Sequence, residues 1–297
     1  MRKLLVLFFT LFGLSAYADG LRDELLAFTK NYRAQIGVAV IIDHMDTVCI
    51  NNSADYPLMS VFKFHQALSV ADVLHRRGLS LDAPVYVRKK DLRPDTYSPL
   101  RDRFPDGNVW LTVRELLRYT LQLSDNNACD ILFKHFGGPK TVKRYVRRCG
   151  LHDFDIRHDE AAMHRRLERC YENRTSPLDV ARLIEYVRTR EHPGQENFDY
   201  IYQLMETCGT GRDRLVAPLL STNAIVGHKT GTGDRNKDGK IIAINDIGYV
   251  WLPNHHGYVI AVFVKDSEET PETTAAIIAG ISARVWQYVC GLPPIPR

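Results

Sequence analysis

The chain has 297 residues, a formal net charge of +4, and a composition that is 45% hydrophobic and 25% charged. This length is sufficient for one large domain or two closely packed domains with a substantial core. Acidic residues dilute the basic ones along the chain, which argues against a nucleic-acid partner. Beyond the N-terminus, no stretch is long and apolar enough to cross a bilayer.

Residues 1–18 have the features of a signal peptide. Arg2 and Lys3 are basic, an apolar run extends from Leu4 to Leu14, and Ala16-Tyr17-Ala18 matches a cleavage site with small residues. The apolar run is too short for a typical membrane span, and an uncleaved anchor is the alternative interpretation. We therefore expect a periplasmic or secreted protein that begins near Asp19 and has no membrane attachment after cleavage.

Apolar residues recur at strand or helix spacing through the rest of the chain. In chain order they predict a helix at 21–33, then strands at 36–42 and 47–50 with a turn at His44. The periodicity from 57 to about 210 is helical, with helices at 60–76, 112–121, 126–136, 139–149, 177–190 and 197–208. Strands at 225–229, 241–252 and 258–265 and a helix at about 271–288 complete the chain.

The predicted strands come from both ends of the chain, with a block of helices between them and one further helix near each end. This order predicts an α+β fold, in which an α/β sandwich with an antiparallel sheet carries an inserted all-α domain. Residues 19–56 and 211–297 form the first part in this prediction, and residues 57–210 form the all-α domain. We expect the functional site where the two parts meet, because clefts are common at such junctions.

The six cysteines do not show the C-x-x-C spacing of a metal or redox site. An exported compartment permits disulfides, but six cysteines allow fifteen pairings and the sequence does not choose among them. Cys129 falls inside a predicted buried helix and is expected to be a small core residue. No His-Glu-x-x-His motif occurs, which argues against a zinc hydrolase. We expect neither a metal nor a cofactor.

Ser60 and Lys63, in Ser60-Val61-Phe62-Lys63, share one face at the start of a predicted helix. A serine hydroxyl becomes a good nucleophile when a neighbouring base takes its proton. A lysine amine serves as that base when burial or nearby cations lower its pKa. A serine near a helix start with a solvent-facing lysine is the structural alternative for this motif taken alone.

Two later segments complete the pattern of a serine acyl-transfer site. Ser124-Asp125-Asn126 falls in a break between helices, where Ser124 can protonate a leaving nitrogen and Asn126 can hold a substrate carbonyl. Asp125 is expected to be a helix cap. Lys229-Thr230-Gly231 ends a strand and supplies positive charge, while Gly231 lets a substrate backbone approach the strand edge. Ser-x-x-K, S-D-N and K-T-G together are the set found in class A β-lactamases and penicillin-binding proteins.

The chain resembles the class A serine β-lactamases over essentially its whole mature length. It is most similar to the subgroup represented by the PER and CfxA enzymes, whose motifs correspond to Ser124–Asp130, Glu160–His164 and Asn245–Gly248. The resemblance implies a serine acyl-enzyme mechanism on an all-α plus α/β fold. It also implies a β-lactam substrate, either penicillins or cephalosporins or both, and the subgroup leans toward cephalosporins. A monomeric enzyme is the default expectation.

The resemblance assigns Glu160 to the activation of the water that releases the acyl group. Lys63 and Glu160 are both expected to contribute to the base that takes the Ser60 proton during acylation, because the identity of that base in the family is disputed. A surface acid in the pair Asp159-Glu160 is the alternative. The backbone N–H groups of Ser60 and Thr232 are expected to form an oxyanion hole.

Several positions depart from the common class A pattern. His164 stands where many relatives carry an asparagine, and Ile244 stands roughly where an arginine is common. Arg214 matches an arginine that replaces it in related enzymes, where it can pair with the substrate carboxylate together with Lys229 and Thr230. Tyr97 matches an aromatic residue at the site entrance, and a merely packed tyrosine is the alternative.

The resulting prediction is a serine β-lactamase with Ser60 as the nucleophile. Two other functions use the same serine–lysine pattern. A D-alanyl-D-alanine carboxypeptidase or transpeptidase would lack a deacylating acid, so Glu160 argues against it. A penicillin-binding sensor that stays acylated would normally carry a membrane-spanning or signalling segment, and the sequence shows none beyond the predicted signal peptide.

Overall fold

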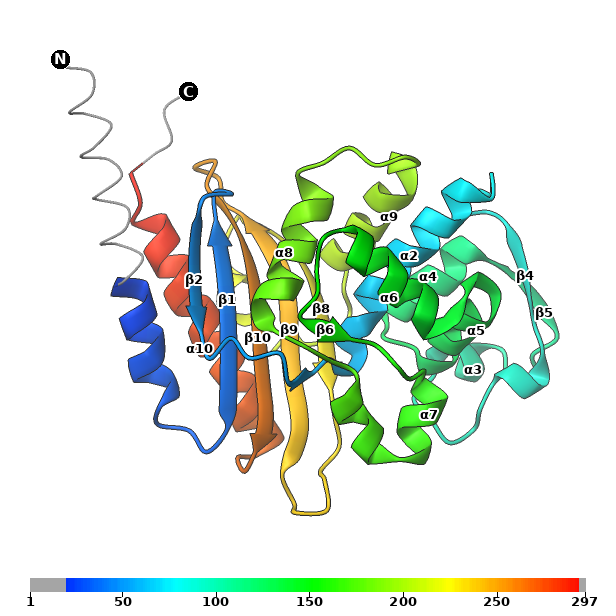
Figure 1. Cartoon of the computed structure of the whole chain (residues 1–297), viewed down its shortest axis with the longest axis horizontal. Helices are drawn as coiled ribbons and strands as arrows, with labels where there is room; N and C mark the ends of the chain where they lie inside the picture. The colour runs from blue at the N-terminus through cyan, green and yellow to red at the C-terminus, as the bar shows by residue number, and fades with distance from the viewer. Residues whose placement is uncertain (1–19, 294–297) are drawn as a thin grey trace.

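A computed structural model describes residues 20–293 (Figure 1). The predicted signal peptide, residues 1–18, lies outside the described residues. Within 20–293, no helix has the length and apolarity needed to span a bilayer. All six cysteines fall in this range and carry free thiols, with Cys129 completely buried in the core as predicted.

A five-stranded antiparallel sheet runs through the molecule in the order β2-β1-β10-β9-β8. Its strands are β1 (Gln35–Ile42), β2 (Asp46–Ile50), β8 (Ile225–Thr232), β9 (Ile241–Trp251) and β10 (Gly257–Ser267). β9 and β10 are buried along almost their whole length. Both faces of the sheet are therefore covered, which explains why these two strands are nearly continuous apolar runs.

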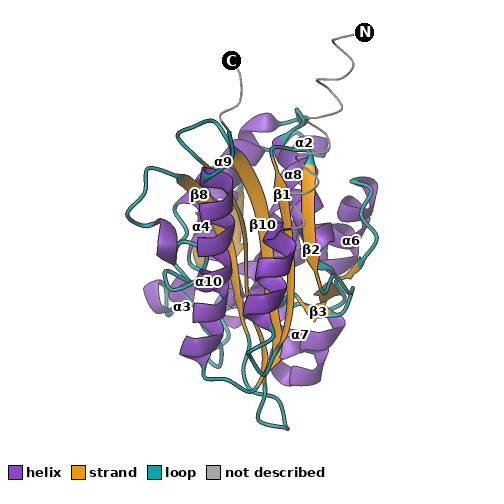
Figure 2. Cartoon of the chain, turned by 90° about the vertical axis from the view of Figure 1, so that its left-hand side faces the viewer, coloured by secondary structure: helices purple, strands orange, loops and turns teal. Residues whose placement is uncertain are grey.

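Two terminal helices cover one face of the sheet (Figure 2). They are α10 (Pro271–Cys290) and the N-terminal helix, which is helical over residues 20–29. The apolar side chains of these helices pack on alternate residues of the strands, including Val38, Val40 and Ile260. The N-terminal helix is shorter than the predicted 21–33, because the chain turns before it enters β1.

The other face carries the helical part of the chain. α8 (Pro177–Arg188) lies against β1 and β10. α2 (Phe62–Arg76) is buried along most of its length among α4 (Val113–Gln122), α5 (Asn126–Phe136), α6 (Gly138–Arg148) and α9 (Gln195–Glu206). One apolar core extends from these helices onto the sheet. The last turn of α9 and the start of α2 and α5 thus lie near the edge strand β8.

The prediction of helices alone between 57 and 210 is wrong where five short strands form two small sheets. β4 (Pro84–Val87) pairs with β5 (Val109–Thr112), and β3 (Tyr56–Pro57), β7 (Arg174–Thr175) and β6 (Phe154–Asp155) form a small sheet. Strands of two to four residues contain too few positions to show a period, so pattern reading misses them. The division of the chain into domains at 57 and 210 stays a prediction.

Candidate active site

The residue before Ser60 holds a strained backbone conformation. A short 3₁₀ turn, Met59–Val61, leads directly into α2, and Met59 has a φ of 45°. A non-glycine residue in this left-handed region costs about 1–3 kcal/mol and persists only where the surrounding structure enforces it. Lys63 follows one turn later, and its Nζ lies 3.1 Å from Ser60 Oγ.

The Lys63 side chain is completely buried, so its amine needs polar partners. Nζ donates to the backbone oxygen of Ser124 at 2.7 Å and to Asn126 Oδ1 at 2.6 Å. It also lies 2.9 Å from Glu160 Oε1, which in turn is 3.5 Å from Ser60 Oγ. The nucleophile, the amine and the carboxylate therefore form one triangle.

A second serine–lysine pair lies on the other side of this triangle. Lys229 Nζ donates to Ser124 Oγ at 3.0 Å and to the backbone oxygen of Thr230 at 2.7 Å. Burial lowers the pKa of Lys229 to about 8, and the positive charges of Lys63 and Arg214 act in the same direction. Ser124 itself has a φ of 58°, so both serine segments contain a left-handed residue.

Asp130 holds Glu160 in place. α7 (Glu160–Arg165) begins at Glu160, and Asp130 accepts the backbone N–H groups of Glu160 and Ala161, each at 2.9 Å. Asp159 caps the same helix by accepting the N–H of Ala162. Burial raises the pKa of Asp130 to about 7, and the charges of Asp159 and Glu160 add to this effect.

Asp130 is a functional residue that the sequence interpretation missed. It lies one helical turn after Asn126 on α5, so the two side chains share one face of this helix. Since Asn126 was already assigned to the site, this spacing was a usable signal. The spacing alone could not show that Asp130 accepts the backbone N–H of Glu160, thirty residues further along the chain.

We expect Asp130→Asn to reduce turnover by about 10- to 100-fold, because a small displacement of Glu160 is costly in a preorganised site. Asparagine offers one acceptor oxygen to two backbone N–H groups, so one of them loses its partner. Steady-state kinetics and the fraction of acyl-enzyme in quenched samples measure the effect, and the adduct should increase. Asp106→Asn, at a fully exposed aspartate, is the control. Turnover within about threefold of the wild type would contradict this role.

Gly231 lies against the backbone of the segment that carries the nucleophile. A Cβ atom at this position would approach Leu58 O to 2.8 Å and Ser60 N to 3.3 Å. Asn245 on β9 supports the same contact by donating to the backbone oxygens of Pro57 and Leu58. Close packing therefore also requires a glycine at this position, since a side chain here would push Ser60 away from β8. This requirement adds to the predicted one, which is the approach of a substrate backbone to the strand edge.

Arg214 is 8% exposed and lies along β8. Its guanidinium donates to the backbone oxygens of Gly231 and Asn245, both at 3.0 Å, and to Thr232 Oγ1 at 2.7 Å. These contacts fix its position next to Gly231 and Thr232. The arginine therefore contributes positive charge at the end of the strand that holds Lys229.

The catalytic cleft is a small cavity of about 110 Å³ between α7 and the end of β8. His164 lines this cavity and has Nε2 3.2 Å from Asp95 Oδ2. Thr96 also lines it and accepts a hydrogen bond from Asn126 Nδ2 at 2.8 Å. Tyr97 is 58% exposed, and its backbone oxygen accepts the N–H of Asn126. The structure thus brings the predicted site residues to one region, with Tyr97 at its margin.

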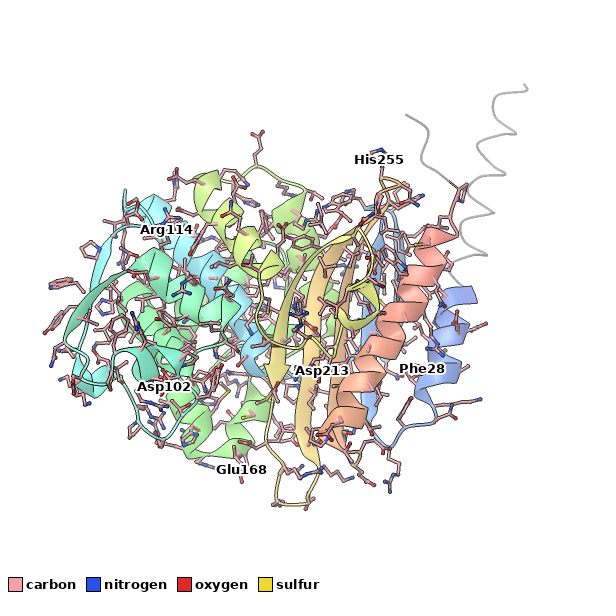
Figure 3. All side chains as sticks on the ribbon, turned by 180° about the vertical axis from the view of Figure 1, so that it is seen from behind. Phe28, Asp102, Arg114, Glu168, Asp213 and His255 are labelled. Atoms are coloured by element: carbon pink, nitrogen blue, oxygen red, sulfur yellow. The ribbon has the colours of Figure 1, made fainter. Side chains whose placement is uncertain are left out.

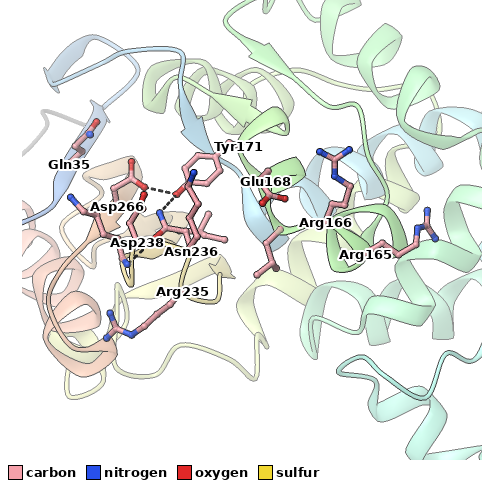
Figure 4. Close-up of a pocket in the computed structure, with 13 residues that line it drawn as sticks. Gln35, Arg165, Arg166, Glu168, Tyr171, Arg235, Asn236, Asp238 and Asp266 are labelled. Atoms are coloured by element: carbon pink, nitrogen blue, oxygen red, sulfur yellow. Dashed lines mark hydrogen bonds between the residues drawn. The ribbon is translucent and has the colours of Figure 1, made fainter.

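A larger groove of about 760 Å³ continues from the cleft at Leu167, which lines both (Figure 4). It lies between the segment 165–171 and the loop that joins β8 to β9. Arg165, Arg166 and Arg235 extend along it, and Tyr171 links the two walls through Asp266 at 2.6 Å and Asn236 at 2.9 Å. The groove gives the site room for a substrate much larger than the cleft alone could hold.

A serine in contact with a buried lysine, a second serine with its own lysine, and a carboxylate beside both define a serine hydrolase that works through an acyl-enzyme. Residues 20–289 match the family described as "Beta-lactamase enzyme family". The chain belongs to this family and is a class A β-lactamase, as the motifs predicted.

Known relatives support this assignment. The chain is 40% identical to a β-lactamase of Bacteroides uniformis over 90% of each protein. It is 32% identical to the extended-spectrum β-lactamase PER-1 of Pseudomonas aeruginosa, over 96% of this chain and 92% of that protein. The crystal structure of a class A β-lactamase from Bacteroides cellulosilyticus superimposes with a TM-score of 0.87 at 39% identity, covering 92% of this chain and 98% of that one. The peptidase and sensor alternatives are therefore not favoured.

Proposed function

We propose that Ser60 opens the β-lactam ring and that Glu160 activates the water that releases the product. The observation that carries this proposal is the triangle of Ser60, Lys63 and Glu160, with separations of 3.1, 2.9 and 3.5 Å. Either Lys63 or Glu160 is close enough to receive the hydroxyl proton as Ser60 Oγ attacks the lactam carbonyl. The N–H groups of Ser60 and Thr232 stabilise the resulting oxyanion.

Ser124 completes the acylation step in this proposal. The departing lactam nitrogen needs a proton, and Ser124 Oγ can donate one because Lys229 lies 3.0 Å away to resupply it. Water then attacks the acyl carbon, and Glu160 takes the proton of that water. Lys63 stabilises the Glu160 carboxylate through their 2.9 Å contact. No metal or other cofactor enters these steps.

We propose that Lys229, Thr230 and Arg214 bind the substrate carboxylate, and that Asn126 holds the carbonyl of its side chain. Two residues of β8 and the adjacent guanidinium of Arg214 form a suitable anion site. Gly231 and Tyr97 border the bound substrate in this arrangement, and His164 contacts it from α7. The adjoining groove of about 760 Å³ favours cephalosporins with a bulky side chain.

We also propose that the mature enzyme is a periplasmic or secreted monomer that has no nucleic-acid or membrane partner. The support is the basic-apolar-small pattern of residues 1–18 and the mixed surface charge of the chain. An N-terminal sequence of the purified mature protein and its mass in solution test these two points.

Incubation with excess cephalosporin tests the proposed reaction. We expect ring opening, followed by absorbance, to continue for many turnovers without a long-lived adduct on the protein. A single stoichiometric burst of ring opening, with a long-lived adduct on the wild-type protein, would contradict the hydrolase mechanism and favour a peptidase or sensor. The absence of both adduct and turnover would show that the substrate class is different.

The pKa of Lys229 predicts a basic limb in the pH profile. Lys229 is protonated below its pKa of about 8 and loses its charge above it. The substrate carboxylate then loses its cationic partner, so we expect kcat/KM to fall as the pH rises through 8, by up to about tenfold per pH unit. Lys229→Arg should move this limb to higher pH, because arginine stays charged. A wild-type profile that is flat to about pH 10 would refute this assignment.

A further inference from the structure

We propose that Cys208 is a reactive thiol that takes small, neutral carbon electrophiles, and that its modification reduces β-lactam turnover. The site is a pocket beside β8 that is lined by Cys208 and His228 and shares no lining residue with the catalytic cleft. The first half of the proposal concerns the thiol alone. The second half rests on the function proposed above.

The pocket has a volume of about 390 Å³ and is separate from both the catalytic cleft and its adjoining groove. Cys208 follows the last turn of α9 and lines the pocket together with His228. Side chains alternate along a strand, so His228 and Thr230 lie on one face of β8 and Lys229 on the other. Figure 3 shows this side of the molecule, where the segment that carries Asp213 lies over the strands beside α10.

Cys208 is part of a thiol–imidazole–carboxylate cluster. Its thiol lines the same pocket as His228 and lies 3.7 Å from the backbone oxygen and 3.4 Å from Oγ1 of Thr210. His228 Nδ1 is 3.0 and 3.1 Å from the two carboxylate oxygens of Asp246. His228 is 3% exposed and Asp246 is fully buried, whereas Cys208 is partly exposed. A thiol, an imidazole and a carboxylate in this order are typical of an activated cysteine. The chemistry proposed for Ser60 does not use this cluster.

The charges around the cluster favour the thiolate. Burial raises the pKa of Cys208, but the interaction with His228 and the positive charge of Lys229 outweigh this effect and lower the pKa to about 7. Burial likewise lowers the pKa of His228, but Asp246 raises it to about 10. The pocket is also lined by Glu206 and Arg212, which contribute one negative and one positive charge.

Cys208 differs in this respect from the other five cysteines. Burial raises the pKa of every one of them, and Cys170 reaches about 12. Since the thiolate is the reactive form, the charges around Cys208 make it the preferred target near neutral pH. Cys290, which is exposed, provides a natural comparison because burial alone shifts its pKa, in the opposite direction.

The covalent step is the addition of a thiol to an α,β-unsaturated carbonyl. Cys208 Sγ forms a bond to the β-carbon, and the electron pair of the alkene moves toward the carbonyl. The α-carbon then takes a proton from solvent, which balances the proton that the thiol gave up. No oxidant, reductant or leaving group is required.

A direct chain of contacts links this pocket to the substrate site. Thr210 Oγ1 is 3.4 Å from Cys208 Sγ and 2.6 Å from Thr230 Oγ1. Thr230 belongs to the proposed carboxylate site, and its neighbour Lys229 interacts with the Cys208 charge. A thioether at Cys208 removes that negative charge and crowds Thr210, so it disturbs the carboxylate site through Thr230.

N-ethylmaleimide tests the reactivity, with peptide mapping by mass spectrometry and with initial rates measured from about pH 5.5 to 8.5. We expect Cys208 to react at least about tenfold faster than Cys290 at pH 7, with a rate midpoint near 7. A midpoint for Cys208 above 8.5, or no faster reaction than Cys290, would overturn the proposal. This measurement uses the wild-type protein, so it does not depend on how any variant folds.

Turnover of the labelled enzyme tests the coupling. We expect stoichiometric labelling of Cys208 to reduce kcat/KM at least about tenfold, mainly through KM. Cys208→Ser should stay active and resist the reagent, whereas Cys290→Ser should remain as sensitive as the wild type. Labelling of Cys208 without loss of turnover would overturn the coupling. Unlabelled enzyme that fails to turn over any β-lactam would instead refute the proposed function.

Discussion

Ser60→Ala removes β-lactam turnover, and we expect kcat/KM to fall by at least about 10⁴-fold. The acyl-enzyme cannot form without Ser60 Oγ, which is the hydroxyl that Lys63 holds. Lys63 keeps three partners after the change, namely Ser124, Asn126 and Glu160. Stability should therefore change by no more than about 1 kcal/mol.

Absorbance assays and intact-protein mass spectrometry measure this result, and thermal unfolding shows whether the variant is folded. Ser221→Ala, at an exposed serine away from the cleft, is the matched control and should behave as the wild type. A folded Ser60→Ala protein that still forms a covalent adduct with a cephalosporin would contradict the assignment of the nucleophile.

Glu160→Gln accumulates the acyl-enzyme. Glutamine preserves the size of the side chain but cannot take a proton from water, so we expect deacylation to slow by about 10²- to 10⁴-fold. Quenched samples should contain protein carrying the mass of one opened β-lactam. Glu172→Gln, an exposed glutamate in the same loop that pairs with His158, is the control.

The speed of adduct formation in Glu160→Gln separates the two candidates for the acylation base. Rapid formation followed by slow release assigns that step to Lys63. Slow formation as well as slow release shows that Glu160 shares it. If the Glu160→Gln variant turned over substrate at the wild-type rate without any adduct, Glu160 would have no role in the mechanism.

The strained residues at Met59 and Ser124 explain how the two serines reach this geometry. Each lies in the left-handed region, with φ values of 45° and 58°. Contacts from distant segments hold them, since Asn245 binds the backbone before Met59 and the Ser124 oxygen accepts a hydrogen bond from Lys63. Strain of this kind is stable only inside a completed fold, so pattern reading does not detect it.

The main elements of the fold could be read from the sequence because they are long and periodic. The helix predicted at 126–136 matches α5 (Asn126–Phe136), and the strand predicted at 241–252 differs from β9 by one residue. Asp125 caps α5 by accepting the N–H of Ala128, as its position suggested. The short strands β3, β6 and β7 escaped prediction, since their pairing depends on segments distant in the sequence.

The motifs alone were enough to assign the class of enzyme. They also predict Ser60, Lys63, Ser124 and Lys229 as its reactive groups, because the spacing of these motifs can be read from the chain without coordinates. The neighbours that act on these groups are visible in the folded chain and not in the motifs. Asp130 accepts the backbone N–H of Glu160, Arg214 donates to Thr232 of β8, and His228, which lines the Cys208 pocket, contacts Asp246. Motifs record local spacing, whereas burial, charge and pKa arise from groups that folding alone brings together.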